Sequence, residues 1–177
     1  MSRRAALVFL ATGAAAAALG AGIHWWRTEP TRIDGASAAL FAASFPDAQG
    51  RPQSLSQWRG QLLVVNFWAT WCPPCVDEMP DLQKVRDAYR HRGVEVIGIG
   101  IDHAAKVTAF RDRFNLSLPL LVAAAGGSDL YRALGNTGGA LPYTVLIGRD
   151  GGIRQRHMGR IQPDQLRRWI DSALAAA

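Results

Sequence analysis

Residues 61–80 read Gln-Leu-Leu-Val-Val-Asn-Phe-Trp-Ala-Thr-Trp-Cys-Pro-Pro-Cys-Val-Asp-Glu-Met-Pro, and this stretch decides the fold. The run from Leu62 to Trp68 has the length and the valine content of a strand that is buried on both faces of a sheet. After the second cysteine, apolar residues recur at helical spacing: Val76, Met79, Leu82, Val85 and Tyr89. A strand therefore delivers a Cys-x-x-Cys pair to the first turn of a helix, which predicts a redox site.

The position of Cys72 favours a reactive thiolate. The unpaired N–H groups and the dipole of a helix N-terminus stabilise an anion, so we expect more of this thiol to be ionised at neutral pH. Pro73 and Pro74 stiffen a first turn in which a missing N–H donor costs little. Cys75 lies one turn further along and is expected to be less exposed. We therefore predict that Cys72 is the nucleophile and that Cys75 resolves the mixed disulfide.

Two motifs resemble the thioredoxin superfamily. Asn66-Phe-Trp-Ala-Thr-Trp-Cys-Pro-Pro-Cys75 resembles its active-site block, and the continuation to Pro80 is similar to the exported branch that contains TlpA, ResA and CcmG. Residues 139–147, followed by Asp150-Gly151, are similar to the cis-proline strand and hairpin of that branch. The resemblance covers roughly residues 44–177. It implies a thioredoxin-like three-layer α/β/α domain with a mixed central sheet, preceded by an N-terminal hairpin and a hydrophobic segment.

The remaining pattern also indicates an α/β domain. Turn residues within residues 45–52 predict a hairpin, and Asp102 and Ser128 are placed to cap the two helices that follow them. Further strands are expected at Gly93–Ile101, Tyr143–Ile147 and Ile153–Met158, with a last amphipathic helix from Pro163. Strands that alternate with helices before a final hairpin and helix indicate a mixed sheet with helices on both faces.

Residues 1–26 are predicted to be a targeting segment. Two arginines precede the uncharged stretch Ala5–Ile23, which would span roughly 28 Å as a helix, close to the ~30 Å of a bilayer core. Trp25 and Trp26 suit the membrane interface. We expect an uncleaved anchor, with a cleaved signal peptide as the alternative. Residues 27–43 would be a tether with a short helix at Ala36–Ala42, and residues 44–177 the folded domain. The domain would lie at the periplasmic face of the bacterial inner membrane or be secreted to the periplasm.

Composition excludes one class of partner. The chain has 177 residues, 49% of them hydrophobic, and a net charge of +6. Nucleic-acid binding predicts a dense basic stripe with interleaved aromatic residues, and no such stripe is present. The nearest candidates are interpreted as the solvated face of an edge strand: Arg149, Arg154, Arg156 and Arg160. We expect a monomer that binds no nucleic acid.

The cysteine count favours a redox-active dithiol without a metal or another cofactor. Cys72 and Cys75 are the only cysteines, and a disulfide that closes so short a loop would constrain the unfolded chain little. A zinc site would need a second ligand pair, and the four histidines are scattered. Haem attachment needs a histidine after the second cysteine, where Val76 stands.

Glu78 is a candidate for proton transfer. It follows Cys75 by three residues, so a helix places both on the same side. Ordinary thioredoxins carry a buried acidic residue at the position where this chain has Asn66. The asparagine side chain cannot titrate. In the resembling branch a glutamate at the Glu78 position is implicated in proton transfer to and from the dithiol. The alternative is a solvated helix glutamate.

Four residues are predicted to bind substrate. Pro142 resembles the cis proline opposite the active site, where it would leave the backbone of Leu141 free to pair with an extended substrate. The alternative is an ordinary strand-edge proline. Trp71 would shield Cys72 or contact substrate, with plain packing as the alternative. Pro73 is the fourth residue predicted to bind substrate.

We interpret the chain as an exported thiol-disulfide oxidoreductase that reduces protein disulfides. The resemblance implies a membrane electron donor of the DsbD or CcdA type, and clients such as apocytochrome c or copper-site proteins. Leu141-Pro142-Tyr143 departs from the CcmG pattern, which favours a general TlpA-like reductase. Two alternatives remain. A peroxiredoxin-like peroxidase would need a threonine where Ala69 stands, and a copper chaperone would recruit a histidine near the dithiol.

Overall fold

The computed structural model describes residues 35–124 and 126–176. The predicted targeting segment, residues 1–26, and residues 27–34 of the predicted tether lie outside this part of the chain. Among the residues that the structure describes, no helix is both long and apolar enough to cross a membrane.

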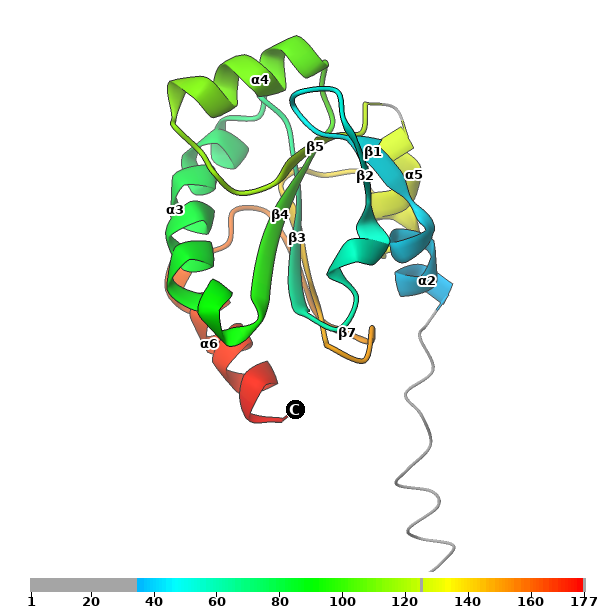
Figure 1. Cartoon of the computed structure of the whole chain (residues 1–177), viewed down its shortest axis with the longest axis vertical. Coiled ribbons are helices and arrows are strands. Elements are labelled where there is room, and N and C mark those ends of the chain that lie inside the picture. Colours follow the sequence, from blue (N-terminus) through cyan, green and yellow to red (C-terminus); the bar gives the residue numbers. More distant parts are fainter. Residues whose placement is uncertain (1–34, 125, 177) are drawn as a thin grey trace, which may run out of the picture. The chain divides into compact units, whose positions relative to one another are not determined.

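The domain is built on a five-stranded sheet, which is mixed as predicted (Figure 1). Strand β3 (Leu62–Trp68) lies at its centre and all of its residues are buried. On one side β3 pairs in parallel with β4 (Val94–Gly100), which pairs in parallel with β5 (Leu120–Val122). On the other side β3 pairs antiparallel with β6 (Tyr143–Ile147), and β6 pairs antiparallel with the edge strand β7 (Ile153–Met158).

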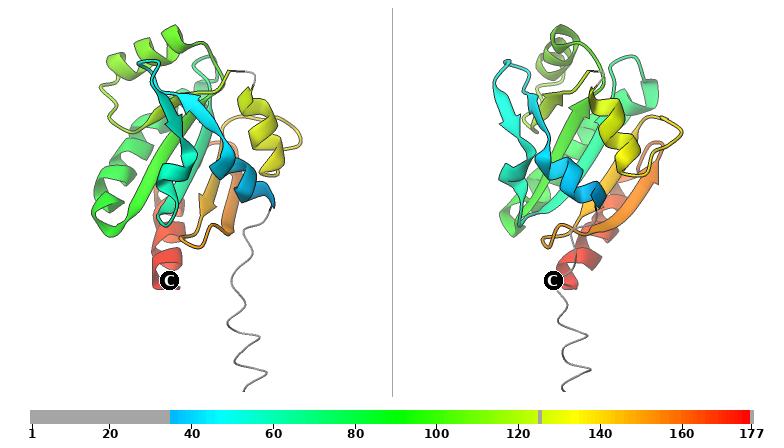
Figure 2. Two further views of the ribbon diagram at one scale, coloured as in Figure 1. Left: turned by 45° about the vertical axis from the view of Figure 1, so that its right-hand side comes forward. Right: turned by 90° about the vertical axis from the view of Figure 1, so that its right-hand side faces the viewer.

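Helices cover both faces of the sheet, which confirms the three-layer prediction (Figures 1 and 2). One face is covered by α3 (Pro73–Tyr89), α4 (Ala104–Arg113) and α6 (Pro163–Ala175). The other is covered by α2 (Gly35–Ala42), α5 (Gly126–Ala133) and the short 3₁₀ helix η1 (Leu55–Trp58). A second 3₁₀ turn, η2 (Arg90–Arg92), follows α3.

The alternation of side chains along β3 divides the core into two parts. Leu63, Val65 and Phe67 pack with α2 and α5. Val64 and Trp68 pack with α3, α4 and α6, in the cluster that also contains both cysteines. Gly98 on β4 allows this packing, because a Cβ there would lie 3.0 Å from the Trp68 indole nitrogen and 2.7 Å from the Leu120 side chain.

The predicted N-terminal hairpin is present as β1 (Ser44–Pro46) and β2 (Pro52–Ser54). Asp47 closes its turn by accepting hydrogen bonds from the backbone N–H groups of Gln49 and Arg51, both at 2.9 Å. Asp47 also forms a backbone bridge to Leu121, so the hairpin lies beside β5.

The folded unit begins earlier than residue 44. Leu40 and Phe41 on α2 are buried in the core, and the guanidinium of Arg59 lies 4.6 Å from the centre of the Phe41 ring. The short helix expected at Ala36–Ala42 is present as α2, but it supplies part of the layer that covers the sheet and does not belong to a tether. A run of alanines with one Leu-Phe pair carries little periodicity, and this is why the packing was not evident from the sequence.

If α2 belongs to the domain, Leu40→Ala should lower the free energy of unfolding by about 2–5 kcal/mol, since the side chain is fully buried. Chemical denaturation measures the change. Ala39→Ser, at an exposed position of the same helix, should change it by no more than about 0.5 kcal/mol. Equal stability of wild type and Leu40→Ala would show that α2 contributes nothing to the fold.

Candidate active site

The Cys-x-x-Cys motif lies where the sequence predicts, between β3 and α3. Cys72 is the N-cap residue of α3, with extended backbone dihedral angles (φ −102°, ψ 101°), and prolines occupy the first two helical positions. The Cys72 carbonyl accepts hydrogen bonds from the N–H groups of Cys75 at 3.0 Å and Val76 at 3.1 Å. The helix therefore starts at the first cysteine and holds the second one turn further in.

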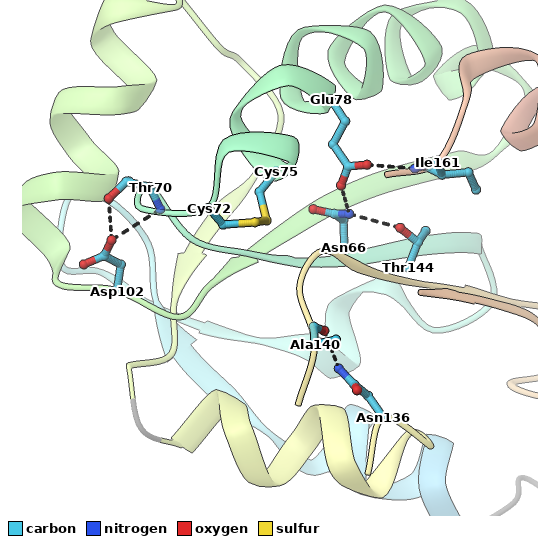
Figure 3. Close-up of a disulfide and its surroundings, with 10 residues drawn as sticks. All are labelled: Asn66, Thr70, Cys72, Cys75, Glu78, Asp102, Asn136, Ala140, Thr144 and Ile161. Atoms are coloured by element: carbon cyan, nitrogen blue, oxygen red, sulfur yellow. Dashed lines mark hydrogen bonds between the residues drawn. A yellow bond between two sulfur atoms is a disulfide. The ribbon is translucent and has the colours of Figure 1, made fainter. Parts of the chain in front are cut away.

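The two cysteines form a disulfide, with their Cα atoms 5.3 Å apart (Figure 3). Cys72 is 5% exposed and Cys75 is fully buried. Since a partner reaches the more accessible sulfur first, this difference supports Cys72 as the nucleophile and Cys75 as the resolving thiol.

Glu78 lies on α3, three residues after Cys75, and is fully buried, so the alternative of a solvated helix glutamate is wrong. Its Oε1 accepts a hydrogen bond from Asn66 Nδ2 at 2.7 Å, and its Oε2 accepts one from the Ile161 N–H at 2.9 Å. Burial raises the pKa of Glu78 to about 7, although these two hydrogen bonds and the charge of Arg160 act in the opposite direction. A carboxyl group with this pKa can both accept and release a proton at neutral pH.

The segment before β6 contributes Leu141 and Pro142. The peptide bond between them is cis, so the expected isomer is observed. Pro142 is buried, and its carbonyl accepts a hydrogen bond from the Gly159 N–H at 2.8 Å. Leu141 is half-buried and packs against the cluster that contains both cysteines. Leu141 therefore contacts the part of the core to which the two cysteines belong, next to the cis proline.

Trp71 and Pro73 flank Cys72 at the surface. The Trp71 side chain is 63% exposed, so plain packing does not account for it. Pro73 is also exposed. Trp71 borders a cavity of about 350 Å³, whose other lining residues are Ile101, Asp102, His103, Lys106, Ala124 and Ser128. An exposed indole beside a reactive sulfur suits contact with a protein substrate.

Asp102 has a role that the sequence did not indicate. The N-cap of α4 is His103, not Asp102 as predicted. The Asp102 carboxylate instead accepts hydrogen bonds from the hydroxyl and the N–H of Thr70 and from the N–H of His103. Burial raises the pKa of Asp102, but these bonds and nearby Lys106 outweigh it and lower the pKa. The carboxylate thus fixes the turn that carries Trp71, and only the tertiary structure reveals it.

No group of three or more His, Cys, Asp or Glu side chains that could hold a metal ion occurs within residues 35–124 and 126–176.

The prediction that Ser128 caps α5 is wrong, because this helix begins at Gly126, ahead of Ser128.

Comparison with known proteins places the chain in a family. The model of the AhpC/TSA family matches residues 35–156. The chain belongs to this family. It is 31% identical over 147 residues to the thiol-disulfide oxidoreductase ResA of Geobacillus thermodenitrificans, covering 82% of this chain and 81% of the relative. It is 32% identical over 126 residues to ResA of Halalkalibacterium halodurans, covering 71% and 69%.

A solved structure agrees with these relatives. A thiol:disulfide interchange protein of the thioredoxin family from Chlorobium tepidum is 28% identical and has a TM-score of 0.65, covering 75% of this chain and 92% of that one. The resemblance to the thioredoxin superfamily is therefore confirmed. Together with the Cys72–Cys75 pair, it identifies the protein as a thiol-disulfide oxidoreductase.

The pKa of Glu78 predicts how stability changes with pH. A carboxyl group whose pKa rises from 4.5 to about 7 on folding binds its proton more tightly in the folded state. Its contribution to stability is therefore full below pH 4.5 and is lost as the pH rises to about 7. Relative to Glu78→Gln, wild type should lose about 3 kcal/mol over this range in denaturation experiments.

The exposed Asp87 on the same helix supplies the control for this experiment. Asp87→Asn should keep the pH dependence of wild type. Parallel stability curves for wild type and Glu78→Gln would contradict a raised pKa at Glu78.

Proposed function

We propose that this oxidoreductase works as a reductase of protein disulfides. The observation that carries the proposal is the burial of Glu78 on α3, three residues after the resolving cysteine, with a pKa of about 7. A reductase must deprotonate its buried second thiol during each turnover, and Glu78 is the buried group able to take that proton. An enzyme that works in this direction leaves the reaction oxidised and needs an electron donor.

The reaction begins when the Cys72 thiolate attacks one sulfur of a substrate disulfide. This forms a mixed disulfide and releases the other substrate sulfur as a thiolate. Cys75 then transfers its proton to Glu78 and attacks Cys72 Sγ, which releases the second substrate thiolate and forms the Cys72–Cys75 disulfide. Two electrons pass from the enzyme dithiol to the substrate, and an external dithiol restores the enzyme.

Substrate binding is assigned to the surface around Cys72. Trp71 and Pro73 would contact the substrate on the α3 side, and the backbone of Leu141 would pair with an extended segment next to Pro142. Substrates would be exported proteins with exposed disulfides, apocytochrome c and copper-site proteins among them. No cofactor other than the dithiol is required.

Location and partners form the remainder of the proposal. The apolar composition of residues 1–26 supports membrane attachment or export, with the domain at the periplasmic face of the bacterial inner membrane or in the periplasm. A membrane protein of the DsbD or CcdA type would reduce the Cys72–Cys75 disulfide. The protein would act as a monomer.

The reduction potential tests the direction of electron transfer. Equilibration of the chain with glutathione and with dithiothreitol should give a value near the ~−270 mV of thioredoxin, as suits a reductase. A value near the ~−120 mV of DsbA would make the protein an oxidant and overturn the proposal.

Glu78→Gln tests the proton transfer. At pH 7 the substitution should slow release of the second substrate thiolate by about 100-fold, within the range that general acid–base catalysis contributes. Formation of the mixed disulfide should be unaffected. Stopped-flow fluorescence with a disulfide peptide separates the two steps, with Asp87→Asn as the control. If both steps keep the rates of wild type, Glu78 has no part in the reaction.

A further inference from the structure

Asn66 lies between Glu78 and the disulfide. Its side chain projects from β3 and is fully buried. The amide nitrogen uses both of its N–H groups: one donates to Glu78 Oε1 at 2.7 Å and the other to Thr144 Oγ1 at 3.0 Å. These two acceptors determine which way the amide is turned.

The amide oxygen of Asn66 is left without a partner. Oδ1 is buried and has no hydrogen-bond donor among the residues that the structure describes. Figure 3 shows this oxygen turned toward the Cys72–Cys75 disulfide, on the opposite side of the amide from Glu78. A buried acceptor without a donor is unfavourable, because it has given up its hydrogen bonds to water.

The redox state of the cysteines changes what faces this oxygen. A disulfide sulfur carries no proton, whereas a thiol is a hydrogen-bond donor. Cys75 is the fully buried partner in the disulfide and is held on the same face of the sheet as Asn66. Reduction therefore creates a donor next to an acceptor that lacks one.

We propose that the Cys75 thiol donates a hydrogen bond to Asn66 Oδ1 in the reduced protein, so that Asn66 stabilises the dithiol form. This inference rests on the proposed function, since it concerns the same reaction. The bond keeps the proton on Cys75 while Cys72 is ionised, which determines the sulfur that attacks first. One amide then joins the resolving thiol on one side to the carboxylate of Glu78 on the other.

The test is the equilibrium between the protein disulfide and glutathione, in which two glutathione molecules are oxidised for each dithiol formed. Asn66→Leu removes the acceptor with little change in size. Its equilibrium constant for dithiol formation should fall about 5- to 10-fold, the effect of one hydrogen bond. This corresponds to a potential lower by about 20–30 mV.

Thr144→Val supplies the matched control. It removes the other partner of the Asn66 amide but leaves Oδ1 in place, so the potential of wild type is expected. An effect of Thr144→Val equal to that of Asn66→Leu would show that the potential responds to general loss of packing, and it would overturn the proposal.

A second comparison separates Asn66 from Glu78. At pH 6 and at pH 8, on either side of the pKa of about 7 of Glu78, Asn66→Leu should lower the equilibrium constant by the same 5- to 10-fold, because the proposed bond joins Asn66 directly to Cys75. If the shift disappears at either pH, Asn66 acts through Glu78 and the proposal is wrong. A DsbA-like potential of wild type would refute the reductase function yet leave this difference between variants measurable.

Raman spectroscopy provides a test that keeps Asn66 intact. In Cys72→Ser, Cys75 is the only thiol, since the chain has two cysteines. Its S–H stretch should lie at the lowered frequency of a hydrogen-bonded thiol. A frequency typical of a free thiol would overturn the proposal, whether or not Asn66→Leu folds.

Discussion

The hydrogen bonds of the buried Glu78 carboxylate are the interaction on which the arrangement of the site depends. Glu78 belongs to α3, and its two oxygens bind Asn66 on β3 and the backbone N–H of Ile161, just before α6. Arg160 adds ion pairs to Asp77 and Asp81 at the surface of α3. One side chain thus joins the central strand, the active-site helix and the entry to the last helix. These hydrogen bonds hold α3, whose first turn carries the cysteines, against the sheet.

This arrangement has a cost that a purely structural interaction would avoid. A buried carboxylate loses its hydration, and two hydrogen bonds compensate for that only in part, because the pKa of Glu78 still rises to about 7. A glutamine would satisfy the Ile161 N–H without carrying a charge. The presence of a titratable group at this position is therefore better explained by proton transfer to and from the neighbouring dithiol than by stability.

Local signals in the sequence predicted the central strand, the helix that follows it, the mixed sheet and the Cys72–Cys75 pair. These signals are the spacing of residues that are close in the chain and two short motifs, and both can be recognised without knowledge of the tertiary structure. The contacts of α2 and the hydrogen bonds from Thr70 to Asp102 were not predicted. Each of these contacts joins segments that are far apart in the chain. The residue types that form them are common in many kinds of structure, so they carry no specific signal in the sequence. Asn66 was recognised only as a residue that cannot titrate, because its partners come from α3 and β6.

One face of β3 contributes to the apolar core, and the other carries residues of the redox site. Leu63, Val65 and Phe67 point toward α2 and α5, where the side chains that contact them are largely apolar. Asn66 lies on the opposite face, with the cysteines and Glu78 (Figure 3). Because alternate residues of one strand serve the two faces, a shift of register by one residue would exchange them. The pairing of β3 with both neighbours along its length prevents that shift. The redox site therefore depends on the register of the sheet as well as on the two cysteines.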